Sequence, residues 1–556
     1  MHPVKRETII CPLKPVNNRK NRPIVEIVRY VLSMSQLLRF LTILIGIGWV
    51  FFVSLYQIHT LPPVHYDEAW FGQFANRIAF EPSFWPLEAM NSYTGPILHY
   101  FLALTFRVFG AGVETSRYFF LGLNLATLGA LALLIRRISN GRAVAVFVLF
   151  FGLLPVSVFS QRIQLEVTSW FALCYSVVLW GIVLWNSKPT RAICLIAGGI
   201  WLGLFSHILF FIVPFSLFGG LILERPEVFR TPRAKLACLI VNLPLVFLPL
   251  KMGLNLRDVF PFFLALGFLV LAVLPYLIQD FTRLRVILNP KKIGNPLFRF
   301  IISIGIGILA LAVFAASLVY FLFEFSGSWP YAQITGELRY FWLPLNLIFL
   351  LALVGFSQRK KVDLKLRGLW LVFFLQIGLT GWSVLKATNA KYWTIPTLTL
   401  LIGLALLWGE YSKKVSKKAY LVLAAFTLWN AYLFQECFAN QYRIGPHDRP
   451  FRVWRLSDSA RYYRPAVPAY LWLREKGCHL NKIRVDDGRL QFVVDYYQEY
   501  DRKKASPNST CPWGQREFYF GNEDSAPAGF QKIEESPIWP DMEMRVQDAA
   551  ASNRSH

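Results

Sequence analysis

The sequence predicts an α-helical polytopic membrane protein with a small α/β domain near its C-terminal end. Hydrophobic residues make up 55% of the 556 residues and charged residues only 16%, whereas ordinary globular chains are about 45–50% apolar and about 25% charged. Apolar runs recur through the first 437 residues, and most have about the 20 residues that cross a bilayer. This composition excludes an ordinary soluble protein and a disordered one.

The apolar runs divide the chain into three regions. Residues 1–36 form a basic cytoplasmic tail, residues 37–437 a transmembrane domain and residues 438–556 a soluble extracytoplasmic domain. The first run follows a long polar tail and is long enough to span, so we expect a signal anchor and no cleaved signal peptide. About 13 spans are expected, near 37–59, 116–136, 142–160, 165–186, 192–206, 207–224, 234–250, 259–279, 299–323, 338–356, 368–386, 392–409 and 419–437.

The net charge of +25 is explained by membrane topology. Residues 438–556 are nearly neutral, with 18 Lys and Arg against 16 Asp and Glu. With the N-terminus in the cytoplasm, 31 of the basic residues before Cys437 fall in the tail and cytoplasmic loops and 9 elsewhere, as the positive-inside rule requires. An odd number of spans then puts the C-terminal domain outside. A nucleic-acid-binding protein would carry its basic residues on a soluble face, so we expect membrane lipid and no nucleic acid as partner.

The first large outside loop, 60–115, contains two short helical patterns. In HYDEAWFGQFANRIAF the apolar residues Phe71, Phe74, Ala75 and Ile78 recur at helical spacing, which predicts an amphipathic helix along the membrane surface. The apolar stretch 96–109 is too short to span and ends at Gly110, which predicts a second interfacial or re-entrant helix.

The soluble domain reads as alternating helices and strands. We expect a helix ending at Gly477, a strand, a helix, a second strand and a candidate third strand, at 468–477, 481–487, 491–500, 516–522 and 529–535. Cys478 and Cys511 are the only cysteines in this domain, and a disulfide would persist on the outside. Their spacing leaves open whether they pair.

Acidic residues are rare in the transmembrane domain, where charge is costly. Asp67 and Glu68 follow the first span among aromatic residues; one could act as a general base and the other could bind a metal or hold a helix terminus. The alternative is that Asp67 caps the following helix. Glu166 lies four residues after Arg162 at the outside start of the fourth span. The two form either an ion pair on one helix face or part of the wall of a polar cavity.

Basic residues on the outer side are candidates for holding a lipid phosphate. Lys386 and Lys391, beside Tyr392, bracket the outside turn before the twelfth span, with snorkelling as the alternative. Arg117 begins the second span and has the same two interpretations. His207, in an outside turn between the fifth and sixth spans, is a metal-ligand candidate or a hydrogen-bonded structural residue.

The segments HYDEAWFGQFANRI, YTGPILHYFLALTFRVFG and ETSRYFF together resemble the membrane glycosyltransferases of the GT-C superfold. The resemblance is to the glycosyltransferase 39 or protein-O-mannosyltransferase-like group, which includes bacterial aminoarabinose transferases that modify lipid A. SQRIQLE, AGGIWLGLFSHILFF and KYWTIPTLTLLIG resemble later segments of that group. The resemblance covers most of 37–437, is strongest across 60–170, and implies a GT-C-type fold.

The resemblance also implies a reaction: inverting transfer of a sugar from a polyprenyl- or dolichyl-phosphate donor to an envelope hydroxyl at the outer face. The enzyme would be a hexosyl- or pentosyltransferase with a lipid, glycan or protein acceptor. No cofactor is certain; some members use a divalent metal, for which His207 would be the candidate ligand. The implied roles are Asp67 as base, Glu68 and Glu166 as further catalytic acids, Lys391, Lys386, Arg162, Tyr392 and Arg117 around the donor phosphate, and Tyr93 and His99 in the substrate loop.

Two differences from the family's sequence pattern bear on the identity of the acceptor. YTGPILHY replaces the Lys-Pro-Pro stretch of the lipid A group, so lipid A is not assigned, and the inserted repeats of eukaryotic protein mannosyltransferases are missing. A bacterial inner membrane is the expected location. The alternatives are a lipid or oligosaccharide transporter without chemistry, which would show inverted repeats and charges near the bilayer midplane, and a scaffold for an envelope complex. No Walker A or GxGxxG motif supports ATP-driven transport or Rossmann-type chemistry.

Overall fold

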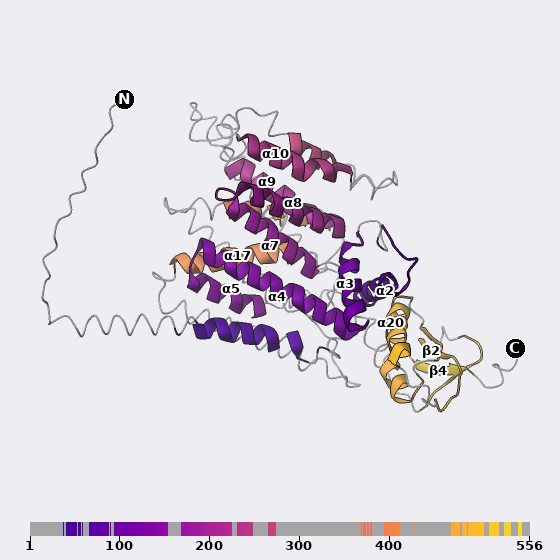
Figure 1. Ribbon diagram of the computed structural model, residues 1–556. Coiled ribbons are helices and arrows are strands. Elements are labelled where there is room, and N and C mark those ends of the chain that lie inside the picture. Colours follow the sequence, from indigo (N-terminus) through magenta and orange to yellow (C-terminus); the bar gives the residue numbers. More distant parts are fainter. Residues whose placement is uncertain are drawn as a thin grey trace, which may run out of the picture.

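The computed structural model describes the ranges 40–52, 66–87, 94–153, 168–224, 231–247, 265–273, 394–411, 469–478, 481–485, 488–504, 511–521, 527–534 and 543–547, with short stretches near 55 and 375. The helices described between residues 113 and 411 lie side by side in one bundle (Figure 1). Each begins close to the start of an expected span. They are α4 (Val113–Ile138), α5 (Gly141–Leu153), α7 (Thr168–Leu184), α8 (Pro189–Ser206), α9 (Ile212–Glu224), α10 (Pro232–Asn242) and α17 (Thr394–Tyr411).

Local sequence explains where these helices begin. Pro189 and Pro232 occupy first-turn positions of α8 and α10, where a missing N–H costs nothing. The Asn140 side chain accepts hydrogen bonds from the backbone N–H groups of Arg142 and Ala143, at 3.0 and 3.2 Å, and so caps α5. Its amide also donates to the carbonyl of Gly409 at 2.8 Å, which ties the start of α5 to the end of α17.

The expected break at Ser206 and His207 is confirmed. Helix α8 ends at Ser206, and His207 is extended with φ −164° and ψ 135°. The 3₁₀ helix η2 (Ile208–Phe211) follows directly and leads into α9. The apolar residues 192–224 therefore form two separate α-helices, with the turn at His207 and η2 between them.

A buried hydrogen-bond network joins α7 to α17 inside the bundle. The Tyr175 hydroxyl lies 2.7 Å from the Thr399 hydroxyl, which donates to the Gln376 side-chain oxygen at 2.6 Å. All three side chains are buried. Polar groups away from water must satisfy one another, so this network fixes the register of the two helices.

Two of the described helices, α4 and α8, are long and apolar enough to cross a membrane by length and composition. The expected spans near 299–323, 338–356 and 419–437 lie outside the described residues apart from Leu428. The total of 13 spans therefore stays a prediction.

Both helices expected in the first outside loop are present, at one end of the bundle (Figure 1). They are α2 (Tyr66–Phe80) and α3 (Ile97–Phe109). The predicted stripe of Phe71, Phe74, Ala75 and Ile78 is buried. Helix α3 ends at Gly110, whose φ of +84° is a conformation that glycine adopts without strain.

The C-terminal part contains a helix over 469–475, then β1 (Ile483–Val485), α20 (Gly488–Lys504), β2 (Phe518–Gly521), β3 (Phe530–Lys532) and β4 (Glu543–Gln547). The strand order is β1-β2-β4-β3, with β1 parallel to β2 and the other pairs antiparallel. The first three strands lie in segments where the sequence predicted strands, whereas β4 was not predicted. Cys478 and Cys511 form a disulfide.

This α/β part packs on α2 and the start of α4. Its core includes Ala69 of α2 and Val113 of α4 together with Tyr496 and Tyr497 of α20. Figure 1 shows α20 beside α2 at the end of the bundle. Helix α2 is therefore held between the bundle and the C-terminal part.

Candidate functional site

The first turn of α2 carries both acidic residues that the sequence singled out. Asp67 is the second residue of the helix, and the structure describes its backbone only. Glu68 follows and is fully buried, at 0% exposed. Consecutive residues of a helix are about 100° apart around its axis, so the two acids occupy different faces.

Glu68 forms a two-point ion pair with Arg117 in the first turns of α4. Arg117 Nε and Nη2 donate to the two Glu68 carboxylate oxygens at 2.7 and 3.0 Å. Arg117 Nη1 donates to the Ile58 carbonyl at 2.6 Å. Such forked pairs combine charge with fixed geometry. The pair therefore joins the end of the first span, α2 and α4 at one point.

This geometry bears on two expected roles. Arg117 was expected near the donor phosphate or as a snorkelling anchor, but its side chain is 1% exposed and its donors contact Glu68 and Ile58. Glu68 was expected among the catalytic acids, but both of its oxygens accept hydrogen bonds from Arg117. Of the roles proposed for the acidic pair, holding a helix terminus fits Glu68.

The apolar face of α2 packs against α3 through His99. The imidazole stacks on the Phe71 ring at 3.8 Å between centroids and meets the Phe74 ring edge to face at 4.7 Å. Burial lowers the pKa of His99 to about 3, so the ring is neutral at physiological pH. Arg107 of α3 donates to the Ala79 carbonyl at 2.9 Å and so caps the last turn of α2. Both ends of α2 are thus fixed by arginines.

The YTGP segment is pinned to the turn between α8 and η2. Thr94 and His207 form an antiparallel bridge, and the Gly95 N–H donates to the Ser206 carbonyl at 2.8 Å. A Cβ at Gly95 would lie 1.6 Å from the Phe205 carbonyl oxygen, so only glycine fits. The segments YTGPILHY and GLFSHILFF, both compared above with motifs of one family, therefore touch.

The His207 side chain stabilises this turn. Its Nδ1 accepts a hydrogen bond from the Leu209 N–H at 3.1 Å and caps η2. Its ring packs edge to face on Phe171. Among the residues that the structure describes, no three His, Cys, Asp or Glu side chains come together as a metal site would require.

The remaining candidates of the site lie outside the described residues. They are Tyr93 of the substrate loop, Arg162 and Glu166 before α7, and Lys386, Lys391 and Tyr392 before α17. The helices that follow the last five of these residues, α7 and α17, are neighbours in the bundle and share the Tyr175–Thr399 hydrogen bond.

Sequence reasoning did not identify Tyr496 and Glu499 of α20, which contact α2. A Cβ at Gly72 would lie 2.4 Å from the Tyr496 ring, and Asn76 donates to the Glu499 carboxylate. These partners are more than 400 residues apart in sequence. Neither belongs to a motif, and only the folded chain shows that they reach the acidic helix.

The chain matches no protein-family model and no curated protein. Among solved structures it is similar to ArnT from Cupriavidus metallidurans bound to undecaprenyl phosphate, with 13% identity and a TM-score of 0.47 over 91% of this chain and 98% of that one. It is also similar to the oligosaccharyltransferase of Archaeoglobus fulgidus, with 12% identity and a TM-score of 0.46 over 82% of this chain.

The chain spans 61% of the length of that archaeal oligosaccharyltransferase. Both of these solved structures are GT-C glycosyltransferases, the group that the sequence motifs resemble. The TM-scores of both structural alignments are below 0.5. The functional proposal therefore depends on the residues of this chain.

Proposed function

We propose that this protein is an integral-membrane glycosyltransferase that moves a sugar from a polyprenyl-phosphate donor to an envelope hydroxyl, with inversion, at the outer face of the membrane. The observation that carries the proposal is the fixing of the acidic first turn of α2. Glu68, Arg117 and the Ile58 carbonyl hold that turn at the end of the helix bundle. A catalytic carboxylate must be held in place before reaction, and Asp67 is the residue next to this anchor.

Asp67 is the proposed general base. It takes the proton of the acceptor hydroxyl as the oxygen attacks the anomeric carbon, the bond from that carbon to the phosphate oxygen breaks, and the lipid phosphate leaves. Attack is in line, so no covalent glycosyl-enzyme forms and the retaining arrangement of two close carboxylates does not apply. Glu68 acts by anchoring the helix and Glu166 is the proposed second acid of the site.

The leaving lipid phosphate gains negative charge, which nearby cations stabilise. Lys391 and Lys386, with Tyr392, and Arg162 are the proposed phosphate contacts. All four lie just before α7 or α17, and a hydrogen bond joins these two helices inside the bundle. Arg117 is not included, because its side chain is buried and each of its three nitrogens donates to Glu68 or to the Ile58 carbonyl. Tyr93 and His99 flank the pinned Thr94–Gly95 turn, which would border the acceptor.

An outside location is supported by two independent observations. The positive-inside asymmetry puts α2, α20 and the C-terminal part on the side opposite the basic loops. The C-terminal part also contains the Cys478–Cys511 disulfide, and disulfides persist outside the reducing cytosol. A bacterial inner membrane with the site on the periplasmic face is the proposed setting.

The test is transfer of radiolabelled sugar from polyprenyl-phosphate sugars in membrane vesicles. Wild type is compared with Asp67→Asn and, as a matched control, with Glu81→Gln, which removes an exposed carboxylate from an i,i+4 pair just beyond the other end of α2. We expect wild type and Glu81→Gln to label an envelope acceptor and Asp67→Asn to fold normally without doing so. The labelled product identifies the acceptor as lipid, glycan or protein.

Equal transfer by Asp67→Asn would reject Asp67 as the base. The wild type could instead transfer no sugar from any donor while lipid-linked sugar appears on the opposite face of the vesicle. That outcome would reject the glycosyltransferase proposal in favour of a transporter.

A further inference from the structure

One face of α2 packs against the C-terminal part, except at Glu68, which pairs with Arg117 of α4. Glu68, Gly72 and Asn76 are four residues apart, so they lie in one row along this face. Glu68 and Asn76 are both buried. Helix α20 packs against this row at Gly72 and Asn76, and Figure 1 shows it alongside α2.

Tyr496 occupies the middle of that row. A Cβ at Gly72 would lie 2.4, 2.5 and 2.6 Å from Cε2, Cζ and the hydroxyl oxygen of Tyr496, which are closer than any real Cβ contact. Tyr496 is 3% exposed, so its ring is enclosed and cannot swing into solvent. The missing side chain at Gly72 therefore leaves a notch in the surface of α2, and the Tyr496 ring fills this notch.

The Tyr496 hydroxyl is buried and, within the part of the chain that the structure describes, accepts and donates no hydrogen bond. Burial, and then the negative charge of Glu68, raise the pKa of Tyr496 well above its usual value. The phenol is therefore neutral, and its contribution comes from the shape of the ring against α2.

A second contact sets the register. Glu499 lies one turn after Tyr496 on α20, and its carboxylate accepts a hydrogen bond from Asn76, one turn after Gly72 on α2. Two contacts one turn apart on each helix fix both the rotation of α2 about its axis and its position along it.

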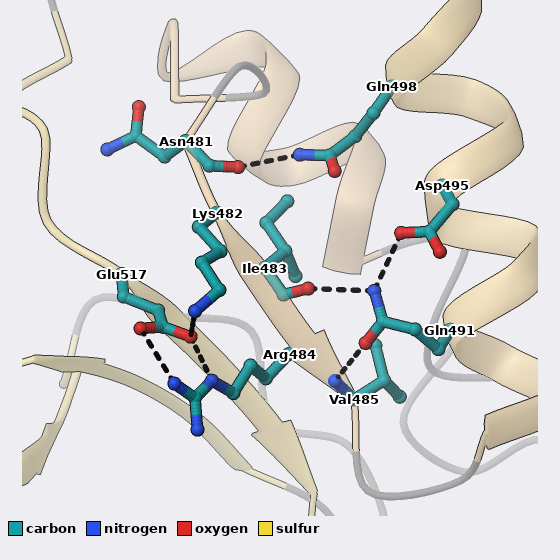
Figure 2. A network of polar contacts seen from close by, with 9 residues as sticks. All are labelled: Asn481, Lys482, Ile483, Arg484, Val485, Gln491, Asp495, Gln498 and Glu517. Atoms are coloured by element: carbon teal, nitrogen blue, oxygen red, sulfur yellow. Dashed lines mark hydrogen bonds and ion pairs between the residues drawn. The ribbon is translucent and has the colours of Figure 1, made fainter.

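Helix α20 is itself attached firmly to the sheet (Figure 2). The Gln491 side chain accepts from the Val485 N–H at 2.8 Å and donates to the Ile483 carbonyl at 2.9 Å, and so pairs with β1 much as a neighbouring strand would. Gln498, two turns later, donates to the Asn481 carbonyl at 2.6 Å. A displacement of α2 would therefore have to move the whole α/β part.

We propose that Tyr496 is a positioning residue and that the C-terminal α/β part holds the catalytic helix: its ring in the Gly72 notch, with Glu499 on Asn76, sets the orientation of the first turn of α2 and hence of Asp67. This inference rests on the proposed function, because it assigns the C-terminal part a role in that same reaction.

The experiment uses the full-length protein in detergent or nanodiscs and compares wild type with Gly72→Ala, Tyr496→Phe and the double variant Gly72→Ala/Tyr496→Leu. Gly122→Ala is the matched control, because a Cβ at that helical glycine meets nothing within 4 Å. Two quantities are measured: hydrogen–deuterium exchange of peptides covering residues 66–72, and sugar-transfer kinetics per folded molecule.

We expect Gly72→Ala to speed exchange of 66–72 and to lower kcat by about 10- to 100-fold with the donor KM unchanged, as a displaced catalytic group does. The smaller Leu at 496 restores both quantities toward wild type, and Tyr496→Phe and Gly122→Ala leave both unchanged. Rescue by the second substitution distinguishes a direct contact from general damage.

Unchanged exchange in Gly72→Ala would overturn the proposal, since α20 would then not hold α2. Faster exchange with unchanged kcat would also overturn it and leave the contact a purely structural one. Faster exchange, with rescue, in a protein whose wild type transfers no sugar would reject the proposed function while showing that α20 still holds α2.

Discussion

Glu68 and Arg117, 49 residues apart in the sequence, form a forked ion pair closed to solvent, with donor–acceptor distances of 2.7 and 3.0 Å. Removing one partner of a buried pair leaves the other charge without compensation, which costs about 3–5 kcal/mol. We therefore expect Glu68→Gln and Arg117→Met each to destabilise the protein by roughly that amount, seen as a lower midpoint of thermal unfolding in detergent.

The double variant Glu68→Gln/Arg117→Met is the control for this prediction. It buries no lone charge, so we expect it to be much less destabilised than the sum of the two single variants. Additive losses would show that the two side chains do not act as a pair.

The local features of the acidic region were predictable from the sequence. The helical spacing of Phe71 and Phe74, the stop at Gly110 and the break at Ser206 each depend on residues within a turn or two, and all three are present. The sequence also singled out Glu68 and Arg117, but not their pairing. Which groups meet across 49 residues depends on the packing of α2 against α4, and no spacing rule reports that.

The features that the sequence did not predict are of two kinds: contacts between residues far apart in the sequence, and a short strand. Tyr496 and Gly72 meet only because the C-terminal part folds back on the first outside loop, and neither residue type marks such a contact. Strand β4 has only five residues. Its two buried apolar residues, Met544 and Val546, alternate with charged and polar ones, which is too weak a pattern to assign without the neighbouring strand.

Gly95 provides a second test of the outer site. An added methyl group would lie 1.6 Å from the Phe205 carbonyl oxygen, and a backbone atom cannot move aside as a side-chain tip can. We expect Gly95→Ala to separate the Thr94–His207 bridge and to cost about 1–3 kcal/mol of stability or more, with loss of sugar transfer.

Gly129→Ala is the matched control for Gly95→Ala, because a Cβ there meets nothing within 4 Å and alanine favours the helix by roughly 0.5–1 kcal/mol. Its thermal midpoint should equal or exceed that of wild type. A Gly95→Ala protein with an unchanged midpoint would show that the turn accommodates a side chain.

Two adjacent glycines of α8 should respond in opposite ways. A Cβ at Gly199 would lie 2.7 Å from Val178 Cγ2 and 2.9 Å from the Cys174 carbonyl oxygen of α7, and small residues at such positions let membrane helices approach closely. We expect Gly199→Leu to force α7 and α8 apart and to reduce the monodisperse fraction in gel filtration sharply.

Gly198 faces away from α7, and a Cβ there meets nothing within 4 Å. Gly198→Leu adds the same apolar side chain at the next position, so it should leave the elution profile unchanged. Similar profiles for the two variants would contradict the close packing of α7 on α8.

His99 predicts an acid-dependent loss of stability. Burial lowers its pKa from 6.5 to about 3 in the folded protein, so below about pH 6.5 the unfolded chain binds a proton that the folded chain excludes. Stability should therefore fall as the pH drops from 6.5 toward 3, by up to about 1.4 kcal/mol per pH unit from this group.

His99→Phe keeps an aromatic ring against Phe71 and removes the titration, so its thermal midpoint should fall less steeply over that range. Tyr100→Phe, which loses only a hydrogen bond to the Pro86 carbonyl, should lower the midpoint similarly at every pH. If wild type and His99→Phe show the same acid slope, the imidazole between Phe71 and Phe74 does not control this transition.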